Sequence, residues 1–431
     1  MSPEGPDAGH AQPASAPRIL AIWTRALDGV DHVGGVYIWR AVRAALVPLG
    51  ALSQARLWNI FERPSLAGAA RAGWWVLLGL LRGRPLPLQC AIFPAADGGR
   101  DVLREAGRAD VVYADGVRTL PLLRRLRRAR PDLRIVVDIQ DLMSRRFDEV
   151  LARALPLPLG YLDAMLPAAL RRVLAAGPPA RLLLRYERMA LRHAERELLR
   201  IADCVSVVSP VEAALLAATH PRGARRAGVV AIPPPMPPAA AVAPAPPRRA
   251  VFIGSDGLMQ NRLTIDHLLD LWERARPDLP LVIYGRQRRP PRQVPGVTWG
   301  GYVGDLVEVY TSGSLLVSPT FLRGGIKTKV LEAFAHGVPV IGNPATFEGM
   351  DLPGYPFCFA DDAALIRFLS DPGPRAAEIA AATAAARSHV EREYGEARFR
   401  ARWAAAIRGT PWRDRAWAPD GAVVAPISSA A

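Results

Sequence analysis

Residues with the types and spacing to bind a phosphate group gather in one short stretch of the second half of the chain. The glycine pair Gly324-Gly325 follows an apolar segment, 314–318, and precedes a helical pattern with Lys327 in its first turn. A helix N-terminus attracts anions, because its first backbone N–H groups are free and the helix dipole is positive there. A second apolar segment, 338–341, follows the helix. This strand–loop–helix–strand unit predicts a site for the diphosphate of an activated small molecule.

Two more glycine-bearing turns come directly after predicted strands in the same half. They are Gly254-Ser255 and Gly285-Arg286. Because glycine has no side chain, each turn lets the backbone approach a ligand closely. Arg286 would clamp a phosphate, and the alternative of an ordinary surface arginine stays open. Together with the glycine pair, these turns predict one diphosphate pocket.

The helix after the glycine pair offers three charged side chains. Lys327 and Lys329 are two positions apart, so they cannot both face one ligand from a helix. We favour Lys327, which is nearer the free N–H groups, and Lys329 is interpreted as a ligand contact or a solvated residue. Glu332 would accept two hydrogen bonds from a ribose diol. Its alternative role is a surface partner for Lys329, one helical turn away.

Polar residues in the first half follow predicted strands in the same way. Gly34-Gly35 precedes a helical pattern, so its backbone N–H groups would face a ligand. Asp115, Asp138 and Asp141 lie at or just past strand ends and are the catalytic candidates. Asp138 has a second interpretation, in which it caps or braces its loop.

Other residues near these turns carry weaker signals. Arg118 and Arg145 would face the ligand or lie on the surface, and His32 is interpreted as a loop residue. Ser209 followed by Pro210 predicts a helix that starts with a serine cap.

The elements that must position these residues alternate between strand and helix patterns, which predicts an α/β fold with parallel sheets. Composition changes at 233–249, a run of mostly proline and alanine that is typical of a semi-rigid linker. We therefore predict two Rossmann-like, doubly wound domains, 18–232 and 250–393, that face a central cleft. The remaining segments are a disordered N-terminus at 1–17, a last helix at 394–412 and a tail at 413–431.

Composition narrows the class of protein. The chain has 431 residues, 50% of them hydrophobic, and a net charge of +15 that comes mainly from arginine. A basic surface attracts nucleic acid, acidic head groups or phosphorylated ligands without choosing among them. Because the arginines are spread along the chain without a nucleic-acid-binding signature, a nucleic-acid partner is not predicted. No acidic metal-binding cluster stands out in the pocket loops, so we predict no metal and no cofactor.

The three cysteines are far apart and make no metal or redox spacing, which favours a reducing compartment. No signal peptide and no apolar run long enough to span a membrane are recognised, so we expect a cytoplasmic protein. The segment 74–81 is apolar and is flanked by arginines. It is interpreted as a core helix or as an interfacial helix that rests on the cytoplasmic face of an anionic membrane.

The second half resembles glycosyltransferases of the GT-B fold, in particular the large retaining GT4 family, also called glycosyl transferases group 1. The resemblance is strongest over about 250–350 and rests above all on the stretch from Gly324 through Lys329, Glu332 and Ala333 to Val340. It continues more weakly through Gly34-Gly35, 138–145 and 202–209. The resemblance implies that the second domain binds a nucleotide sugar, that the first domain binds the acceptor, and that the last helix crosses back to the first domain.

The resemblance also assigns individual residues. The residues expected to bind the donor are Gly34, Gly35, Gly254, Ser255, Gly285, Arg286, Gly324, Gly325, Ile326, Lys327, Thr328 and Glu332. Among the catalytic candidates, Asp141 best matches the loop in which relatives carry an active-site polar residue, often histidine. The family places a second glutamate eight positions before the one matched by Glu332, where this chain has Gly324.

The predicted function is that of a retaining, hexosyltransferase-like enzyme of class EC 2.4. It moves a sugar from a nucleoside diphosphate sugar to a glycan or lipid-linked acceptor, in polysaccharide or glycolipid assembly. Three rivals stay open: a GT-B protein that binds a nucleotide sugar without transferring it, an epimerase or phosphorylase of the same fold, and a nucleic-acid-binding protein.

Overall fold

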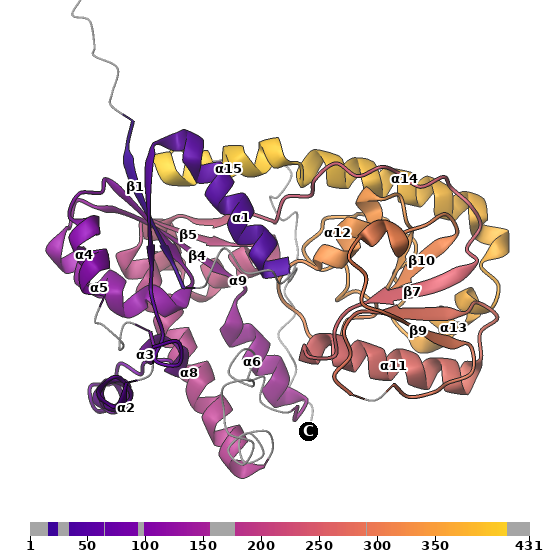
Figure 1. Cartoon of the computed structure of the whole chain (residues 1–431), viewed down its shortest axis with the longest axis horizontal. Helices are drawn as coiled ribbons and strands as arrows, with labels where there is room; N and C mark the ends of the chain where they lie inside the picture. Colours follow the sequence, from indigo (N-terminus) through magenta and orange to yellow (C-terminus); the bar gives the residue numbers. More distant parts are fainter. Residues whose placement is uncertain are drawn as a thin grey trace, which may run out of the picture.

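The computed structural model describes residues 16–24, 34–63, 65–93, 99–155, 177–289 and 291–411. His32 and the predicted tail at 413–431 lie outside these residues. Two parallel sheets, one of six strands and one of five, are packed with helices and lie side by side (Figure 1). The predicted fold class is therefore confirmed.

The first sheet has the strand order β2-β1-β3-β4-β5-β6. Its strands are β1 (Arg18–Trp23), β2 (Ala51–Arg56), β3 (Val111–Asp115), β4 (Arg134–Gln140), β5 (Cys204–Val207) and β6 (Val229–Ala231). The α-helices of this half are α1 (Gly34–Leu46), α2 (Leu66–Leu81), α3 (Leu88–Ala91), α4 (Arg100–Ala106), α5 (Leu120–Ala129), α6 (Met143–Ala152), α8 (Pro178–Ile201), α9 (Pro210–Thr219) and α10 (Pro221–Ala227).

The second sheet has the strand order β11-β10-β7-β8-β9. Its strands are β7 (Arg249–Ile253), β8 (Leu281–Tyr284), β9 (Val297–Gly301), β10 (Ser314–Val317) and β11 (Val340–Ile341). The helices of this half are α11 (Met259–Ala275), α12 (Thr328–Ala335), α13 (Asp362–Ser370), α14 (Ala376–Glu393) and α15 (Glu396–Arg408).

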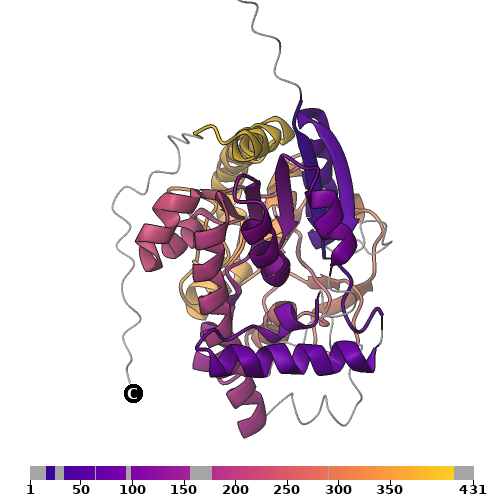
Figure 2. The same ribbon diagram turned by 90° about the vertical axis from the view of Figure 1, so that its left-hand side faces the viewer.

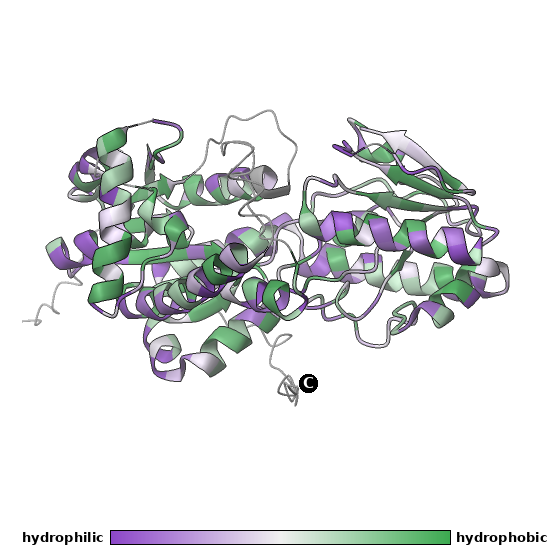
Figure 3. Cartoon of the chain, turned by 90° about the horizontal axis from the view of Figure 1, so that it is seen from below, coloured by the Kyte–Doolittle hydropathy of each residue, from purple (hydrophilic) through white to green (hydrophobic). Residues whose placement is uncertain are grey.

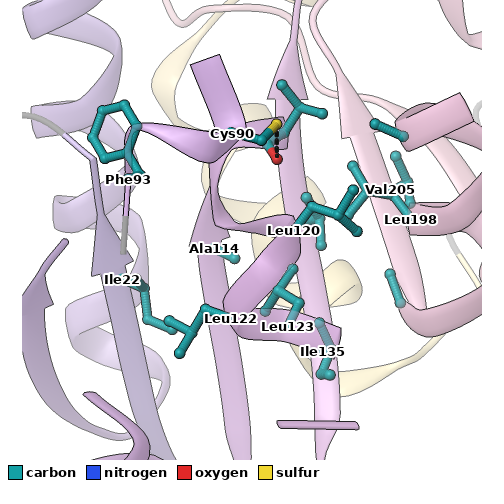
Figure 4. Packing of buried hydrophobic residues seen from close by; sticks show 14 of the residues in the cluster. Ile22, Cys90, Phe93, Ala114, Leu120, Leu122, Leu123, Ile135, Leu198 and Val205 are labelled. Carbon is teal, nitrogen blue, oxygen red and sulfur yellow. Dashed lines mark hydrogen bonds between the residues drawn. The ribbon is translucent and has the colours of Figure 1, made fainter. Parts of the chain in front are cut away.

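Strand periodicity divides each sheet between two apolar cores. Successive side chains of a strand point to opposite faces. Accordingly, Leu20 and Ile22 of β1 pack with α5 and α8, whereas Ile19 and Ala21 pack with α1 and α15. Figure 4 shows the first of these cores, in which the Cys90 thiol lies 3.2 Å from the Val117 carbonyl. Because both faces are covered, the strands are apolar along nearly their whole length.

The segment between the domains lies against the second domain. Residues 232–248 form no helix or strand, yet Met236 is buried and its N–H donates to the Tyr394 carbonyl. Farther along, the Val242 N–H donates to the His336 carbonyl. These bonds fix the segment to α12 and to the end of α14.

The last two helices run along one side of both domains (Figure 1). α14 covers the second sheet, and α15 then packs on the first domain. Trp403 of α15 is buried edge-on against Tyr113 of β3, with ring centroids 5.4 Å apart. The Arg134 guanidinium donates to the Ala406 carbonyl at 2.7 Å. α15 therefore ties the end of the chain to the first sheet.

Two local features differ from what the sequence indicated. β2 was not predicted, because Ser53, Gln54 and Arg56 on this edge strand break the apolar pattern. Ser209 is the N-cap residue of α9, as expected, but its hydroxyl makes no capping hydrogen bond. That hydroxyl is buried without a partner among the described residues.

Candidate functional site

The loops that follow the strands of the two sheets meet at the boundary between the domains. From the first domain come Asp141 and Arg145 after β4 and Glu212 after β5; from the second come Gly324 after β10 and Glu348 after β11. In parallel α/β sheets the carboxyl ends of the strands are where ligands bind. The contact between these loops therefore locates a candidate site between the domains.

The glycine pair lies in the middle of this contact. Gly324 and Gly325 have φ values of +105° and +63°, a region that favours glycine. A β-carbon on Gly324 would lie 2.9 Å from Oε1 of Glu212, and one on Gly325 would collide with Oδ1 of Asp141. A larger residue at either position would be strained by its positive φ and would have to push these carboxylates aside. The glycine turn faces the first domain, and the carboxylates of Glu212 and Asp141 cover it. A ligand that binds the backbone amides of the turn must therefore displace these carboxylates.

Lys327 lies at the start of α12 and points toward the same contact. Its ammonium donates to the Gly324 carbonyl at 2.6 Å, which closes the glycine turn on itself. Burial lowers the pKa of Lys327 and Arg146 lowers it further, whereas Asp141 and Glu212 act in the opposite direction. Ile326 and Thr328 flank Lys327, and Thr328 is the first helical residue.

Lys329 faces the other glycine turns, so its interpretation as a solvated residue was wrong. Its ammonium donates to Oδ1 of Asn261 at 2.9 Å and lies 4.2 Å from the centre of the Phe252 ring. The Asn261 amide in turn donates to the Ser255 carbonyl. Burial lowers the pKa of Lys329 to about 7, an effect that Glu332 opposes. Lys329 therefore belongs to the candidate site.

Glu332 lies one turn beyond Lys329 and is within range of its charge. Burial raises the pKa of Glu332 to about 7, and Lys329 opposes this rise. The charge of Glu332 also acts on the first domain. Burial raises the pKa of Tyr37 to about 12, and the charges of Glu396 and then Glu332 add to this rise. Tyr37 lies in the first turn of α1, which begins at Gly34-Gly35. The predicted glycine pair of the first domain thus starts a helix directed at α12 (Figure 1).

The turns after β7 and β8 are packed backbone to backbone. A β-carbon on Gly285, where φ is +123°, would lie 2.6 Å from the Gly254 carbonyl oxygen. A β-carbon on Gly254 would lie 2.7 Å from Cγ of Asn261. Arg286 is exposed and stacks on Tyr302, with its guanidinium carbon 4.3 Å from the ring centre. The two turns therefore form a floor without side chains, with a cation at its edge.

Two of the predicted catalytic aspartates, Asp115 and Asp138, lie side by side on the paired strands β3 and β4, whereas Asp141 lies at the domain boundary. Asp115 is buried and accepts hydrogen bonds from the Thr24 N–H and hydroxyl at 3.1 and 2.7 Å. Asp138 is buried and accepts from Tyr113 and Ser206 at 3.1 and 3.0 Å. Both carboxylates accept hydrogen bonds inside the first domain, and their catalytic role stays a prediction.

Asp141 is the aspartate that reaches the domain boundary. Its carboxylate is partly exposed, packs on Gly325 and accepts from Arg146 at 2.7 Å. It follows Gln140, a non-glycine residue with φ of +60°, so the chain turns sharply at the end of β4. Of the predicted aspartates, Asp141 alone is placed to act on a ligand at the glycine pair.

Three residues at the boundary were missed by the sequence-based assignment or left undecided by it. Glu212 and Ser209 were not assigned to the site, although they follow β5 as Asp141 follows β4. Arg145, which had two interpretations, pairs with Glu348 of the second domain. Arg118 stays within the first domain, where its guanidinium carbon lies 5.8 Å from the centre of the Phe93 ring.

A metal site and a second cavity are the other possible sites. Within the described ranges, no group of three or more His, Cys, Asp or Glu side chains is placed to hold a metal ion. A separate cavity of about 390 Å³ lies between α6 and α8 and is lined by Asp148, Arg181, Arg185 and Arg188. Its lining includes none of the residues that surround the glycine pair.

Comparisons with known proteins agree with this arrangement. Residues 247–367 match the family model of glycosyl transferases group 1. This segment contains all three glycine turns of the second domain and α12, so the predicted resemblance to this family is confirmed there. A search of curated proteins gave no match.

Solved structures extend the likeness to the whole fold. Sucrose-phosphate synthase from Thermosynechococcus elongatus has a TM-score of 0.58 at 16% identity, over 91% of this chain and 98% of that one. HepE from Anabaena, solved in complex with UDP, has a TM-score of 0.56 at 12% identity, over 91% of this chain and 100% of that one. A further HepE structure contains UDP-glucose. At these identities the likeness establishes the two-domain GT-B fold.

Proposed function

We propose that this chain, a GT-B protein with a group 1 glycosyltransferase segment in its second half, is a retaining, hexosyltransferase-like glycosyltransferase. The donor is a nucleoside diphosphate sugar, and UDP is the favoured nucleotide because the fold relative HepE binds UDP and UDP-glucose. The acceptor is a glycan or a lipid-linked glycan, and the reaction serves polysaccharide or glycolipid assembly. Retention of configuration follows from the family resemblance.

One observation carries the proposal. A glycine pair at the N-terminus of α12 lies between the two domains, directly opposite the Asp141 carboxylate. The free N–H groups of the helix suit a diphosphate. The carboxylate suits the positive charge that develops on a sugar when it leaves a diphosphate. A donor bound across this boundary would place its phosphate on the second domain and its reacting carbon toward the first.

The chemistry is the cleavage of the bond between the anomeric carbon and a diphosphate oxygen. The electron pair leaves with the diphosphate, whose added charge would be stabilised by the N–H groups of α12 and by Lys327 and Lys329. Arg286, in the turn after β8, would contribute a further positive charge. The acceptor hydroxyl then bonds to the anomeric carbon and loses its proton. Opening of the domain boundary would admit the donor, and closing would exclude water.

The rival functions make different predictions for one experiment. Purified protein is incubated with UDP-glucose, UDP-galactose and UDP-N-acetylglucosamine, and thermal stability, UDP release and sugar products are measured. A sugar transferase should be stabilised by a UDP-sugar and should release UDP in the presence of an acceptor. Stabilisation without UDP release would favour a binding protein, and a product sugar without an acceptor would favour an epimerase. Salt-sensitive binding to DNA or RNA that UDP leaves unchanged would favour a nucleic-acid-binding protein.

A helix of the first domain supports the lipid-linked acceptor and a peripheral place at the membrane. α2 lies on the side of the first domain away from the second sheet (Figures 1 and 2). Its Trp74 and Leu81 are 56% and 74% exposed, while Ala72 on the opposite face is buried. Arg71 and Arg82 are exposed on the same helix and at its end.

An outward apolar stripe with flanking arginines suits the surface of an anionic membrane. Seen from below, α2 lies along the edge of the first domain and is largely apolar (Figure 3). The described part of the chain contains no helix long and apolar enough to cross a membrane. We therefore propose that α2 rests on the membrane that carries the acceptor.

A further inference from the structure

Two polar side chains at the start of α9 are buried with few or no hydrogen bonds. The Ser209 hydroxyl has no partner among the described residues, and the Glu212 carboxylate, which is fully enclosed, has only the backbone N–H of Gly325 near it, at a geometry too poor for a regular hydrogen bond. Leaving a buried polar group unpaired costs about 1–3 kcal/mol, and more for a charged group. Two such groups on one helical turn are therefore suited to hydrogen-bond a polar ligand.

Both side chains point at glycines of the second domain. Oε1 of Glu212 lies 2.9 Å from the position of a β-carbon on Gly324. The Ser209 hydroxyl lies 2.6 Å from the position of a β-carbon on Gly349, where φ is +80°. Thus the second domain has a glycine opposite each unpaired group. The Glu212 carboxylate occupies the place that a side chain at position 324 would need.

The charges around Glu212 favour a ligand that donates hydrogen bonds. Burial and then the neighbouring Asp141 raise the pKa of Glu212 to about 7, while Arg145 and Arg146 oppose this rise. Carboxylates accept hydrogen bonds from hydroxyl groups, so a ligand part rich in hydroxyl groups suits this place. The diphosphate of the proposed donor lies on the glycine pair itself. The next part of the donor toward the first domain is its sugar.

We propose that Ser209 and Glu212 form a subsite of the first domain that binds hydroxyl groups of the transferred sugar. Glu212 accepts hydrogen bonds from the sugar, and the Ser209 hydroxyl accepts or donates one. This inference rests on the proposed function, because it names the residues that recognise the donor sugar. It also gives a physical reason for Gly324: the carboxylate at this point comes from the other domain, and a side chain at 324 would displace it.

The test compares a sugar nucleotide with the bare nucleotide. Dissociation constants of UDP and of the tightest of UDP-glucose, UDP-galactose and UDP-N-acetylglucosamine are measured by calorimetry for the wild type, Glu212→Gln and Ser209→Ala. Glu212→Gln should weaken UDP-sugar binding at least about tenfold, since a hydrogen bond to a charged group is worth about 1.5–3 kcal/mol. It should change UDP binding less than about twofold. Ser209→Ala should show the same selectivity with a smaller loss.

A structural role for Glu212 would give a different pattern. If Glu212 binds the sugar, Glu212→Gln removes a buried charge without a strong partner, so the melting temperature of this variant should stay equal or rise. If Glu212 has a structural role, the melting temperature should fall. The matched control is Glu149→Gln, which removes a carboxylate that accepts from the Arg323 N–H across the same boundary. This control should alter both dissociation constants equally and by less than about threefold.

The outcomes separate the two proposals. A wild type that binds neither UDP nor any of the UDP-sugars contradicts the proposed function, and the inference falls with it. A wild type that binds, with Glu212→Gln weakening UDP and UDP-sugar equally or changing neither, contradicts the inference alone. A lower melting temperature together with an equal loss of both ligands would assign Glu212 a structural role.

Discussion

Arg145 and Glu348 join the two domains through a paired contact, in which Nη1 and Nη2 of the arginine donate to the two carboxylate oxygens at 2.8 and 2.9 Å. Arg145 belongs to α6 of the first domain, and Glu348 follows β11 of the second. Both side chains are mostly buried, with 15% and 12% of their surface exposed. The pair therefore holds together the loops that enclose the glycine pair.

Breaking this pair should open the protein. In Arg145→Ala the Glu348 carboxylate loses its close partner, and opening of the domains is the simplest way to hydrate it. A loss of about 1.4 kcal/mol of closing free energy shifts the closed-to-open ratio tenfold. Small-angle X-ray scattering should show a larger radius of gyration. Arg192→Ala, which removes an ion pair with Asp148 inside the first domain, is the control and should leave that radius unchanged.

Gly324 should not tolerate a side chain. Gly324→Ala places a β-carbon against Glu212 and keeps a φ of +105° that alanine disfavours, so we expect a loss of about 1–3 kcal/mol in unfolding free energy. UDP-sugar turnover should fall with it. Gly354→Ala has a similar positive φ of +71° but open space around it, which makes it the matched control. Equal losses of turnover in both variants would mean that the contact with Glu212 is unimportant.

Lys329 should matter for donor binding at least as much as Lys327. Its ammonium bonds to Asn261 beside the Gly254 turn, whereas Lys327 is occupied with the Gly324 carbonyl. Lys329→Ala should weaken UDP binding by about tenfold or more, because a charge-assisted hydrogen bond to phosphate is lost. Calorimetry on the two alanine variants checks this order. A normal dissociation constant for Lys329→Ala would exclude the residue from the diphosphate site.

Asp138 should make stability depend on pH. Burial, and then the charge of Asp115, raise the pKa of Asp138 from 3.8 to about 7. Its contribution to stability is therefore complete below about pH 4 and is lost as the pH rises through about 7, since the unfolded chain releases the proton earlier. Asp138→Asn keeps an oxygen for Ser206 and should gain about 1–3 kcal/mol at pH values near 8 relative to the wild type.

Urea unfolding at acidic and at alkaline pH measures this difference. The gain of Asp138→Asn should shrink as the pH falls toward 4, where the unfolded side chain is about half protonated, and should vanish roughly one pH unit lower, where the wild-type side chain is protonated in both states. The exposed Asp101, exchanged for asparagine, is a control with no expected pH dependence beyond that of the wild type. A gain for Asp138→Asn that is independent of pH would show that its carboxylate is already ionised in the folded protein.

The apolar face of α2 should bind anionic vesicles. Replacing Trp74, Leu77 and Leu81 by serine removes the outward stripe while leaving the buried Ala72 in place. Flotation with phosphatidylglycerol-containing vesicles should recover the wild type at low salt and much less of the triple variant. Val307→Ser, at an equally exposed position of the second domain, should float like the wild type. Absence of wild-type binding to these vesicles would remove the membrane proposal.

Local signals predicted much of the fold and part of the site. The turns at Gly254, Gly285 and Gly324 were predictable because the first two glycines directly follow buried strands and the third lies in the loop between a buried strand and a helix. The roles of individual carboxylates were not predictable in the same way. Asp138 and Asp141 are three positions apart in one segment, yet one is enclosed by β3 and β5 and the other reaches the second domain.

The same limit explains the residues that were missed. Glu212 looks like an ordinary acidic residue in the first turn of a helix, where it suits the helix dipole. Its importance appears only when Gly324, more than a hundred positions later, is brought against it by the meeting of two domains. β2 was missed for a related reason: an edge strand is stabilised by its pairing with β1, which its own polar residues do not show.

The central claim is that the glycine pair and the start of α12 hold the donor diphosphate between the two domains. Hydrogen exchange followed by mass spectrometry, with and without UDP, tests it most directly. UDP should slow exchange in two segments of the second domain, 254–262 and 324–330. It should also slow exchange in 138–146 and 209–213 of the first domain. Binding of UDP with protection confined to other segments, such as the arginine-lined cavity between α6 and α8, would contradict it.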